Sequence, residues 1–373
     1  MKKLLSIIGA RPQIIKVAAF VRAVNAWNNA HPQTAEQIRH VILHTGQHYD
    51  TNMSEAFFDE LGIPAPDIRL NISHAQPASQ ISQMVRGIIR VLNDVPFDGV
   101  VIYGDTNSTF AGALAARHAQ TPVFHIEAGL RSYNLHMPEE INRIVADALA
   151  NILFTPTSAA SHNLTTRNVI QTGDLMLDNT LFFSALAAEK STILFDLKIT
   201  PNSYALATIH RQVNTDNPDN LMSIIVALET ISANTPIVLP LHPRTRSVLP
   251  GECKQRLMKN PRFLLIEPVS FLDMIQLEKN ATIIITDSGG VQKEAFFCSK
   301  PCIVLREETE WKEIVEAGAA ILAGANPQRI QNAFLQLQNK PVLSPNNLYG
   351  DGHAAEQMVH SIASFLGQSA TKH

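Results

Sequence analysis

Short apolar runs alternate along the first half of the chain with polar loops and amphipathic segments. The apolar runs are LLSII, HVILHT, GVVIYG, PVFHI and NILFTPT, and most of them lead through a polar loop into apolar residues at helical spacing. Strands that alternate with helices, and that are apolar throughout, are typical of a parallel sheet with both faces buried. The first half is therefore predicted to be a doubly wound α/β domain.

The same alternation returns in the second half after a break near residues 172–200. The apolar runs there are YALATIH, PIVLPLH, FLLIEP, TIIITDS and PCIVL, with helical segments between them and a last amphipathic segment, AAEQMVHSIASFL. Two doubly wound domains of similar size are predicted. Open parallel sheets bind ligands outside the carboxyl ends of their strands, so we expect a central cleft that the strand-end loops of both domains face.

Composition narrows the class of protein. The chain has 373 residues, of which 45% are hydrophobic, and this is enough for two cores. Its net charge of −3 gives no reason to expect nucleic acid or a membrane surface as a partner. No apolar run approaches the roughly 20 residues of a transmembrane helix, and MKKLLSIIGARPQ lacks the long apolar core of a signal peptide. The three cysteines, an odd number, suit a reducing cytoplasm.

Carboxylates follow two predicted strands and begin a predicted helix. Asp105 follows GVVIYG within GDTNST, where it could equally cap a helix. Glu139 and Glu140 suit the first turn of a helix, and Glu139 could form an ordinary surface pair with Arg143 four residues later. The apolar residues that predict this helix follow at helical spacing and are Ile141, Ile144, Val145 and Ala148. Glu127 directly follows PVFHI, and helix capping does not explain it, so it is the strongest candidate for an acid or a base.

Cations also lie at predicted strand ends. Arg11 and Lys16 follow the first strand, and Arg11 stands at the positive end of the next helix, where a bound anion would stabilise it. A solvated loop arginine is the alternative. His210 and Arg211 end the YALATI strand. A lone histidine is more often structural, but a histidine beside an arginine at a strand exit favours a phosphate or a leaving group.

A glycine pair follows the strand TIIIT. In TDSGGVQKEAF, Ser288, Gly289 and Gly290 precede a predicted helix, whose backbone N–H groups and partial positive charge favour a phosphate. A plain tight turn is the alternative. Glu294, one turn later, could reach sugar hydroxyls. The histidines are scattered and no GxGxxG or HExxH pattern occurs, so neither a metal nor a dinucleotide cofactor is expected. Carboxylates in one half and an anion site in the other suit proton transfer on a sugar carried by a nucleotide.

These loops, taken in order, resemble the non-hydrolysing UDP-N-acetylglucosamine 2-epimerases of bacteria and archaea. The resemblance covers nearly the whole chain and includes GARPQIIK, HTGQHYD, GDTNST, HIEAGLRSYN, MPEEINR, TGDLMLDN, IHRQVNTDN, HPRTR, EPVSFLDM and TDSGGVQKEA. It implies the glycosyltransferase-B fold, with two Rossmann-like domains facing a central cleft. Residues 1–172 plus 355–373 would carry the catalytic carboxylates, and residues 173–354 would carry the UDP site. It also implies a homodimer, a UDP-sugar substrate and a cytoplasmic location.

The resemblance implies inversion of C2 in a UDP-2-acetamido sugar, converting UDP-N-acetylglucosamine to UDP-N-acetylmannosamine. UDP leaves from C1 by anti elimination as C2 is deprotonated, which gives 2-acetamidoglucal, and UDP then adds back. The catalytic residues that it implies are Asp105, Glu127, Glu139 and His210. The UDP- and phosphate-binding residues that it implies are Arg11, Lys16, Arg143, Phe271, Ser288, Gly289, Gly290 and Glu294. No metal and no cofactor are implied.

Other activities share parts of this pattern. The NTDN and HPRT segments also occur in relatives that act on modified UDP-sugars, such as 2,3-diacetamido-uronic acids or 6-deoxy sugars. A hydrolysing epimerase that releases N-acetylmannosamine and UDP, a glycosyltransferase of the same fold and a nucleotide-sugar sensor are further alternatives. Many bacterial members have an activating second nucleotide-sugar site, with a basic or glutamine-bearing segment after TGQH and an arginine in the following loop. Here Tyr49 and Asp50 follow TGQH and NISHAQPASQ has no arginine, so activation is expected to be absent or weak.

Overall fold

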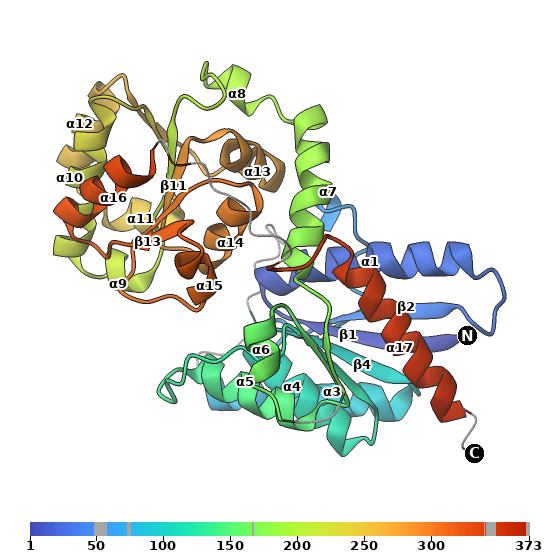
Figure 1. Cartoon of the computed structure of the whole chain (residues 1–373). Coiled ribbons are helices and arrows are strands. Elements are labelled where there is room, and N and C mark those ends of the chain that lie inside the picture. The colour runs from blue at the N-terminus through green and yellow to red at the C-terminus, as the bar shows by residue number, and fades with distance from the viewer. Residues whose placement is uncertain (48–57, 73–75, 166–167, 339, 341–347, 371–373) are drawn as a thin grey trace. The chain divides into compact units, whose positions relative to one another are not determined.

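The computed structural model contains two compact units (Figure 1). One comprises Met1–Asn179 and Asn347–His373, and the other Thr180–Asn346. The structure describes residues 1–47, 58–72, 76–165, 168–338, 340 and 348–370. Tyr49 and Asp50, on which the expected absence of activation depends, lie outside the described residues, as does part of the NISHAQPASQ segment.

The first unit contains a seven-stranded parallel sheet with the order β3-β2-β1-β4-β5-β6-β7. Its strands are β1 (Lys2–Ile8), β2 (Ile38–His44), β3 (Ile68–Arg69), β4 (Gly99–Tyr103), β5 (Val123–Ile126), β6 (Ile152–Thr155) and β7 (Val169–Gln171). Its helices are α1 (Arg11–Ala30), α3 (Pro77–Asp94), α4 (Asn107–His118), α5 (Pro138–Leu149), α6 (Ser158–His162) and α17 (Ala354–Ala370), and α7 (Leu175–Lys190) leads into the second unit. Helices α1 and α17 cover one face of this sheet, while α3, α4 and α5 cover the other (Figure 1).

The second unit contains a six-stranded parallel sheet with the order β10-β9-β8-β11-β12-β13. Its strands are β8 (Ala205–Thr208), β9 (Ile237–Pro240), β10 (Phe263–Ile266), β11 (Ile283–Thr286), β12 (Cys302–Val304) and β13 (Ala320–Leu322). Its helices are α8 (Ile193–Asp196), α9 (Gln212–Thr215), α10 (Pro218–Ser232), α11 (Pro243–Val248), α12 (Gly251–Lys259), α13 (Phe271–Asn280), α14 (Gly289–Phe297), α15 (Lys312–Glu316) and α16 (Pro327–Leu337). The prediction of two parallel-sheet α/β domains is confirmed, and each strand predicted from an apolar run is present.

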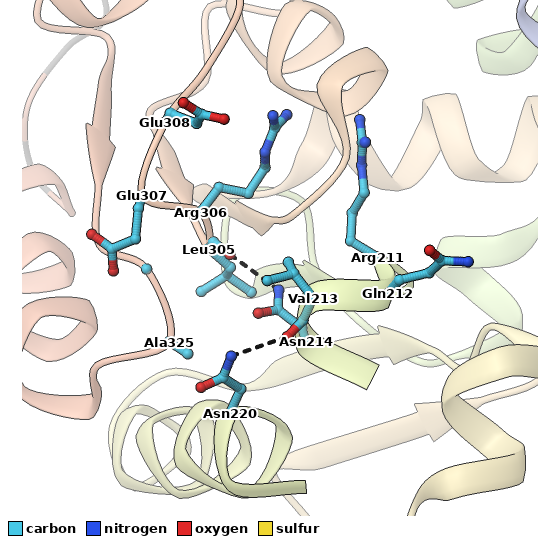
Figure 2. Close-up of a pocket in the computed structure, with 11 residues that line it drawn as sticks. Arg211, Gln212, Val213, Asn214, Asn220, Leu305, Arg306, Glu307, Glu308 and Ala325 are labelled. Carbon is cyan, nitrogen blue, oxygen red and sulfur yellow. Dashed lines mark hydrogen bonds between the residues drawn. The ribbon is translucent and has the colours of Figure 1, made fainter. Parts of the chain in front are cut away.

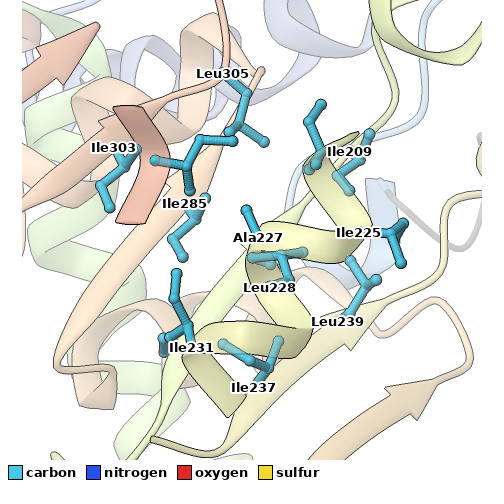
Figure 3. Packing of buried hydrophobic residues seen from close by; sticks show 14 of the residues in the cluster. Ile209, Ile225, Ala227, Leu228, Ile231, Ile237, Leu239, Ile285, Ile303 and Leu305 are labelled. Carbon is cyan, nitrogen blue, oxygen red and sulfur yellow. The ribbon is translucent and has the colours of Figure 1, made fainter. Parts of the chain in front are cut away.

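The core of the second unit explains why its strand ends hold their positions. Ile225 and Leu228 of α10 are fully buried and pack in one cluster with Ile237, Leu239 and Ile285 of the sheet (Figure 3). Each such side chain contributes about 1.5–3 kcal/mol when it leaves water. The strands are therefore fixed by packing, and the polar loops that follow them start from a rigid platform.

The start of α17 is held by a buried carboxylate. Asp178 accepts hydrogen bonds from the backbone N–H groups of Ala354 (3.2 Å) and Ala355 (2.8 Å). Burial raises the pKa of Asp178 to about 6, although these N–H groups and Arg22 oppose the rise. The folded protein therefore binds a proton at Asp178 over a pH range in which the unfolded chain does not.

This raised pKa predicts a pH-dependent stability difference between the wild type and Asp178→Asn. The acid binds its proton more tightly when folded, so ionisation between about pH 4 and pH 6 destabilises the wild type. From pH 4 to pH 7 the wild type should lose up to roughly 3 kcal/mol of unfolding free energy relative to Asp178→Asn. Urea unfolding at both pH values measures this. The exposed Asp94→Asn controls for removal of a charge, and a difference that does not change with pH would contradict the prediction.

Candidate active site

The loops after β1, β4 and β5 meet at the carboxyl edge of the first sheet, because these strands are neighbours. Gln13, in the first turn of α1, connects two of the loops. Its Oε1 accepts a hydrogen bond from Gly9 N–H (2.8 Å), and its Nε2 donates to the carbonyl oxygen of Tyr103 (2.8 Å). The start of α1 is thereby fixed against the end of β4.

Glu127 and Lys16 form a nearly buried ion pair at this edge. Lys16 Nζ donates to Glu127 Oε1 at 2.7 Å, and the two side chains are 9% and 11% exposed. Glu127 has a φ of +67°, a left-handed conformation that costs a non-glycine residue on the order of 1 kcal/mol or more. The chain thus holds this carboxylate in a strained backbone position and places a lysine against it.

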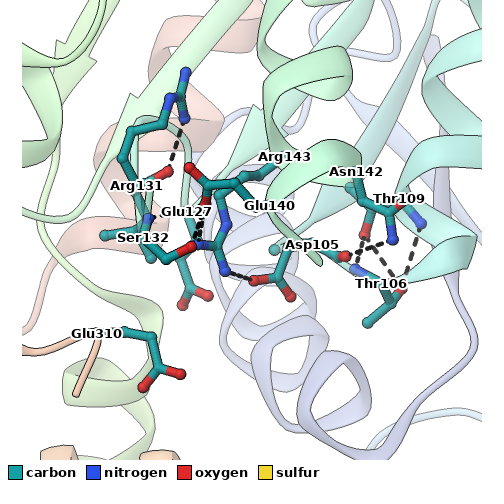
Figure 4. A network of polar contacts seen from close by, with 12 residues as sticks. Asp105, Thr106, Thr109, Glu127, Arg131, Ser132, Glu140, Asn142, Arg143 and Glu310 are labelled. Carbon is teal, nitrogen blue, oxygen red and sulfur yellow. Dashed lines mark hydrogen bonds and ion pairs between the residues drawn. The ribbon is translucent and has the colours of Figure 1, made fainter. Parts of the chain in front are cut away.

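Arg143 connects Asp105 with Glu140 (Figure 4). It is buried, and its Nη2 pairs with Asp105 while its Nη1 donates to Glu140 at 2.8 Å. Burial would lower the pKa of Arg143, but Asp105 and Glu140 together raise it. The guanidinium thus stays charged beside Asp105. A surface pair between Glu139 and Arg143, which the sequence left open, is not formed.

Glu140 has a larger role than its place at a helix start suggested. It is fully buried and accepts hydrogen bonds from the Ser132 N–H (2.9 Å), the Ser132 hydroxyl (3.0 Å) and the Tyr133 N–H (3.0 Å). Burial alone would raise the pKa of Glu140, but these donors and Arg143 hold it below its usual range. Glu140 therefore organises the loop before α5 and fixes the position of Arg143.

The face that α5 buries differs from what its apolar residues suggested. Ile141 and Ile144 are 46% and 37% exposed, whereas Glu140, Arg143 and Asp147 are buried. These three charged residues have the spacing of one helix face. The helix was predicted correctly, but it turns its charged side toward the strand ends.

Glu139 and Arg11 lie at the surface of the same unit. Both are exposed, Glu139 in the first turn of α5 and Arg11 at the start of α1. The structure therefore brings Asp105 together with Arg143 and Glu127 together with Lys16, and leaves Glu139 and Arg11 facing solvent.

A buried charged group that the sequence did not reveal lies beside these residues. His125, fully buried on β5, contacts Asp147 Oδ1 through Nδ1 (2.8 Å), and Asp147 also pairs with Arg131 Nη1 (2.6 Å). Burial would raise the pKa of Asp147, but His125 and Arg131 hold it below its usual range. Within PVFHI a histidine reads as one polar residue in an apolar run, and its partner lies 22 residues away on α5.

In the second unit, Asp287 organises the end of β8. It is fully buried and accepts hydrogen bonds from the backbone N–H groups of His210 (3.0 Å) and Arg211 (3.0 Å) and from Asn214 Nδ2 (3.1 Å). His210 Nδ1 lies 3.3 Å from Asp287 Oδ1. Burial and Arg211 lower the pKa of His210 more than Asp287 raises it. The imidazole is therefore mainly neutral at pH 7.

The glycine pair begins α14. Ser288 caps this helix by accepting a hydrogen bond from Val291 N–H (3.4 Å). The first N–H groups of a helix have no partner within it, and the nearest atom to an added Cβ at Gly290 is 3.8 Å away. The carbonyl of Gly289 accepts from Trp311 Nε1 (3.0 Å), which fixes the orientation of the turn. The Gly289 carbonyl is thus fixed, and an added Cβ at Gly289 would meet Arg211 Nη2 at 3.5 Å, so a cationic side chain lies close to the turn.

The two remaining candidates lie on α13 and α14. Phe271 begins α13, is 6% exposed and packs edge-on against Phe183 with ring centroids 5.2 Å apart. Its side chain belongs to the core, so a ligand would meet the backbone at this helix start. Glu294 is partly buried, one turn into α14.

A pocket of about 780 Å³ opens beside the His210 loop within the second unit (Figure 2). Its lining consists of Arg211, Gln212, Val213, Asn214, Asn220, Leu305, Arg306, Glu307, Glu308, Gly324 and Ala325. Of the residues that the sequence singled out, only Arg211 lines it. Over the described part of the chain, no three His, Cys, Asp or Glu side chains are grouped to hold a metal ion. No helix in that part has the length and hydropathy to cross a membrane.

A family model, two related sequences and a solved structure to which this chain is similar are all of UDP-sugar 2-epimerases. A family model described as UDP-N-acetylglucosamine 2-epimerase matches residues 31–363. The UDP-2,3-diacetamido-2,3-dideoxy-D-glucuronate 2-epimerase of Pseudomonas aeruginosa is 44% identical over 372 residues, which cover 97% of this chain and 99% of that protein. The UDP-N-acetylglucosamine 2-epimerase of Methanocaldococcus jannaschii is 38% identical over 367 residues, covering 96% and 98%. The crystal structure of the M. jannaschii enzyme in complex with UDP-GlcNAc and UDP is similar, with a TM-score of 0.85 and 37% identity over 97% of this chain and 99% of that one.

Proposed function

The chain belongs to the UDP-N-acetylglucosamine 2-epimerase family, and on that premise we propose that it inverts C2 of a UDP-2-acetamido sugar without hydrolysing it. UDP-N-acetylglucosamine, converted to UDP-N-acetylmannosamine, is the first candidate substrate. The observation that carries the proposal is the presence of two ion pairs at neighbouring strand ends. Glu127 pairs with Lys16, and Asp105 pairs with Arg143. Two carboxylates after the neighbouring strands β4 and β5, in a chain of this family, support an acid–base site at this edge of the sheet.

The reaction needs groups on both sides of C2. The C2 hydrogen is not acidic, because no carbonyl is attached to that carbon. A base therefore removes it while the C1–O bond breaks, the electron pair forms the C1=C2 bond of 2-acetamidoglucal, and UDP leaves with the electrons of the broken bond. An oxygen of UDP then adds back to C1, and an acid delivers a proton to the other face of C2. A positioned acid or base contributes roughly 100- to 10,000-fold to such a step.

Asp105, Glu127 and Glu139 are the proposed acid–base carboxylates. Lys16 compensates the charge of Glu127 and so stabilises an ionised carboxylate that is largely shielded from water. Arg143 is proposed as a contact of the diphosphate. Since both of its terminal nitrogens already meet carboxylates, it contributes positive charge rather than two new hydrogen bonds.

UDP is proposed to bind to the second unit. The N–H groups of Gly289 and Gly290, with Ser288, receive the diphosphate at the α14 N-terminus, where the helix dipole favours an anion. Glu294 binds the ribose hydroxyls and the backbone at Phe271 contributes to the nucleotide site. The neutral imidazole of His210 stands at the leaving group, where it can donate a hydrogen bond or gain a proton.

Two sugars compete as the substrate. The 44% identity to an enzyme named for a 2,3-diacetamido-uronate favours a modified UDP-sugar as the second candidate. Both candidates share the 2-acetamido group and UDP, so they undergo the same chemistry at C1 and C2. They differ at C3 and C6.

Incubation of each UDP-sugar in deuterated buffer, with no acceptor, tests the proposal. The expected result by NMR is a UDP-sugar mixture of both C2 epimers with deuterium at C2, formed faster from the true substrate. Accumulation of free N-acetylmannosamine and UDP would instead identify a hydrolysing epimerase. A lack of deuterium at C2 with both sugars would refute epimerisation and leave a glycosyltransferase or a sensor.

The proposal includes a homodimer that acts in the cytoplasm without a metal or an added cofactor. Exposed apolar side chains on neighbouring helices support a second copy as the partner, namely Leu114 on α4 with Ile141 and Ile144 on α5. Light scattering is expected to give the mass of a dimer for the purified chain and the mass of a monomer for Ile144→Glu. If the monomer is fully active, epimerisation does not need the dimer. Full activity in the presence of a chelator would show that it needs no metal.

A further inference from the structure

His125 links the two turns from which Asp105 and Glu127 project. Its Nε2 donates to the carbonyl oxygen of Gly104 at 2.8 Å, and its Nδ1 meets Asp147. Gly104 directly precedes Asp105 and has a φ of +62°. The N–H of the same glycine donates to the carbonyl of Ile126 at 2.9 Å. The turn after β4 is therefore hydrogen-bonded to β5 through both the carbonyl and the N–H group of Gly104.

Asp147 fixes the turn after β5 in the same way. The N–H of Gly129 lies 3.2 Å from Asp147 Oδ2, and Gly129 has a φ of +81°. An added Cβ on Gly129 would lie 2.2 Å from the carbonyl oxygen of Ala160, so only glycine fits. Glu127 is two residues before this glycine. A continuous chain of polar contacts thus connects Gly129 to Asp147, Asp147 to His125, and His125 to Gly104.

The contacts assign a partner to each ring nitrogen of His125. A carbonyl oxygen can only accept, so Nε2 carries a hydrogen and donates to Gly104. Nδ1 lies 2.8 Å from Asp147 Oδ1, and the other carboxylate oxygen, Oδ2, contacts the Gly129 N–H and Arg131 Nη1. The ring is therefore held at both nitrogens.

We infer that the buried pair His125–Asp147 is a positioning element that sets the separation between Asp105 and Glu127. The inference rests on the proposed function, in which those two carboxylates act on the substrate. His125 and Asp147 lie behind the turns and act through the Gly104 carbonyl and the Gly129 N–H. A shift of about 1 Å in a reacting group can lower a rate roughly 100-fold, so this support should affect turnover more than nucleotide binding.

Two variants remove one half of the support each. In His125→Gln the amide nitrogen can replace Nε2 and reach Gly104, but the contact with Asp147 is lost. In His125→Asn the amide nitrogen can replace Nδ1 and reach Asp147, but the contact with Gly104 is lost. Each is expected to lower kcat by roughly 10- to 100-fold per folded molecule, with KM and the Kd of UDP within about twofold of the wild type. Folded protein is counted by near-UV circular dichroism.

His40→Gln is the matched control, since His40 lies on the same sheet and its Nε2 contacts the Ser6 hydroxyl at 2.7 Å. It should change stability without changing kcat per folded molecule. A wild-type kcat in both His125 variants would overturn the inference. If neither variant folds, Asp147→Asn provides the same test, and its unchanged kcat would overturn it equally.

A readout without catalysis separates this inference from the proposed function. In protein with ¹⁵N-labelled histidine, the resonances of His125 are identified by their loss in His125→Gln. The Nε2 proton of His125 is expected to exchange slowly with solvent, because it is buried and donates to Gly104. Rapid exchange of this proton would overturn the positioning scheme. If the wild type epimerises no UDP-sugar while this proton is protected, the proposed function fails and the His125–Asp147 pair keeps its structural role.

Discussion

Replacement of Glu127 by glutamine is expected to lower kcat for epimerisation by roughly 100- to 10,000-fold. The amide can still accept a hydrogen bond from Lys16, so the local structure should persist. It cannot exchange a proton with C2 at neutral pH. Binding of UDP should stay within about twofold of the wild type, because the proposed diphosphate site lies on α14 of the second unit. Steady-state rates with calorimetry of UDP binding measure both quantities.

Two further variants sharpen this test. Asp105→Asn should reduce kcat to a similar degree, because the amide preserves one contact with Arg143 and removes the acid–base group. Glu189→Gln, at an exposed position near the end of α7, controls for loss of a carboxylate and should leave kcat unchanged. A kcat for Glu127→Gln within about threefold of the wild type would remove Glu127 from the proton transfer.

The second large effect is expected from Asp287→Ala. This change leaves the part-buried N–H groups of His210 and Arg211 without this acceptor, and the Asn214 amide nitrogen keeps only the Leu305 carbonyl. An unpaired buried donor costs about 1–3 kcal/mol, so the free energy of unfolding should fall by about 1–3 kcal/mol. The loop that carries His210 should also lose its position relative to the start of α14, so UDP binding should weaken about tenfold or more.

Urea unfolding and calorimetry with UDP test the two parts separately. Asp287→Asn is the informative companion, because its amide oxygen can still accept part of these hydrogen bonds and a smaller loss is expected. Ser288→Ala removes the cap of α14, worth about 1 kcal/mol of stability, together with one proposed contact of the diphosphate. If Asp287→Ala unfolds at the wild-type urea concentration and binds UDP normally, Asp287 does not organise the site.

The parallel sheets could be predicted because buried strands are apolar along their whole length. Such a run needs only its own residues to be recognised, as in TIIIT at β11. Strands β3, β7 and β13 escaped prediction because they are short and only partly buried, whereas β12, also of three residues, is buried throughout. Their strand character comes from pairing with a neighbour, which no local pattern records.

The charged network was predictable only in part. Asp105 and Glu127 follow apolar strands, so topology places them at one edge. The link between His125 and Asp147 depends on how α5 packs against β5, and a sequence carries no direct sign of such a contact. One usable signal existed, since Glu140, Arg143 and Asp147 recur at the period of a helix. A charged stripe on a helix that exposes its isoleucines indicates a buried polar site.

The packing of α17 against the N-terminal part of the chain has a consequence for synthesis on the ribosome. Trp27 of α1 meets His360 of α17 with ring centroids 5.9 Å apart, and Phe124 meets Phe365 at 5.6 Å. The segment Thr180–Asn346, which forms the other unit, is contiguous and can fold as soon as it emerges. At about 5–20 residues per second, the first sheet waits on the order of ten seconds or more for its last helix. During that interval the hydrophobic surface that α17 later covers is open to chaperones, and the domain translated first is the one completed last.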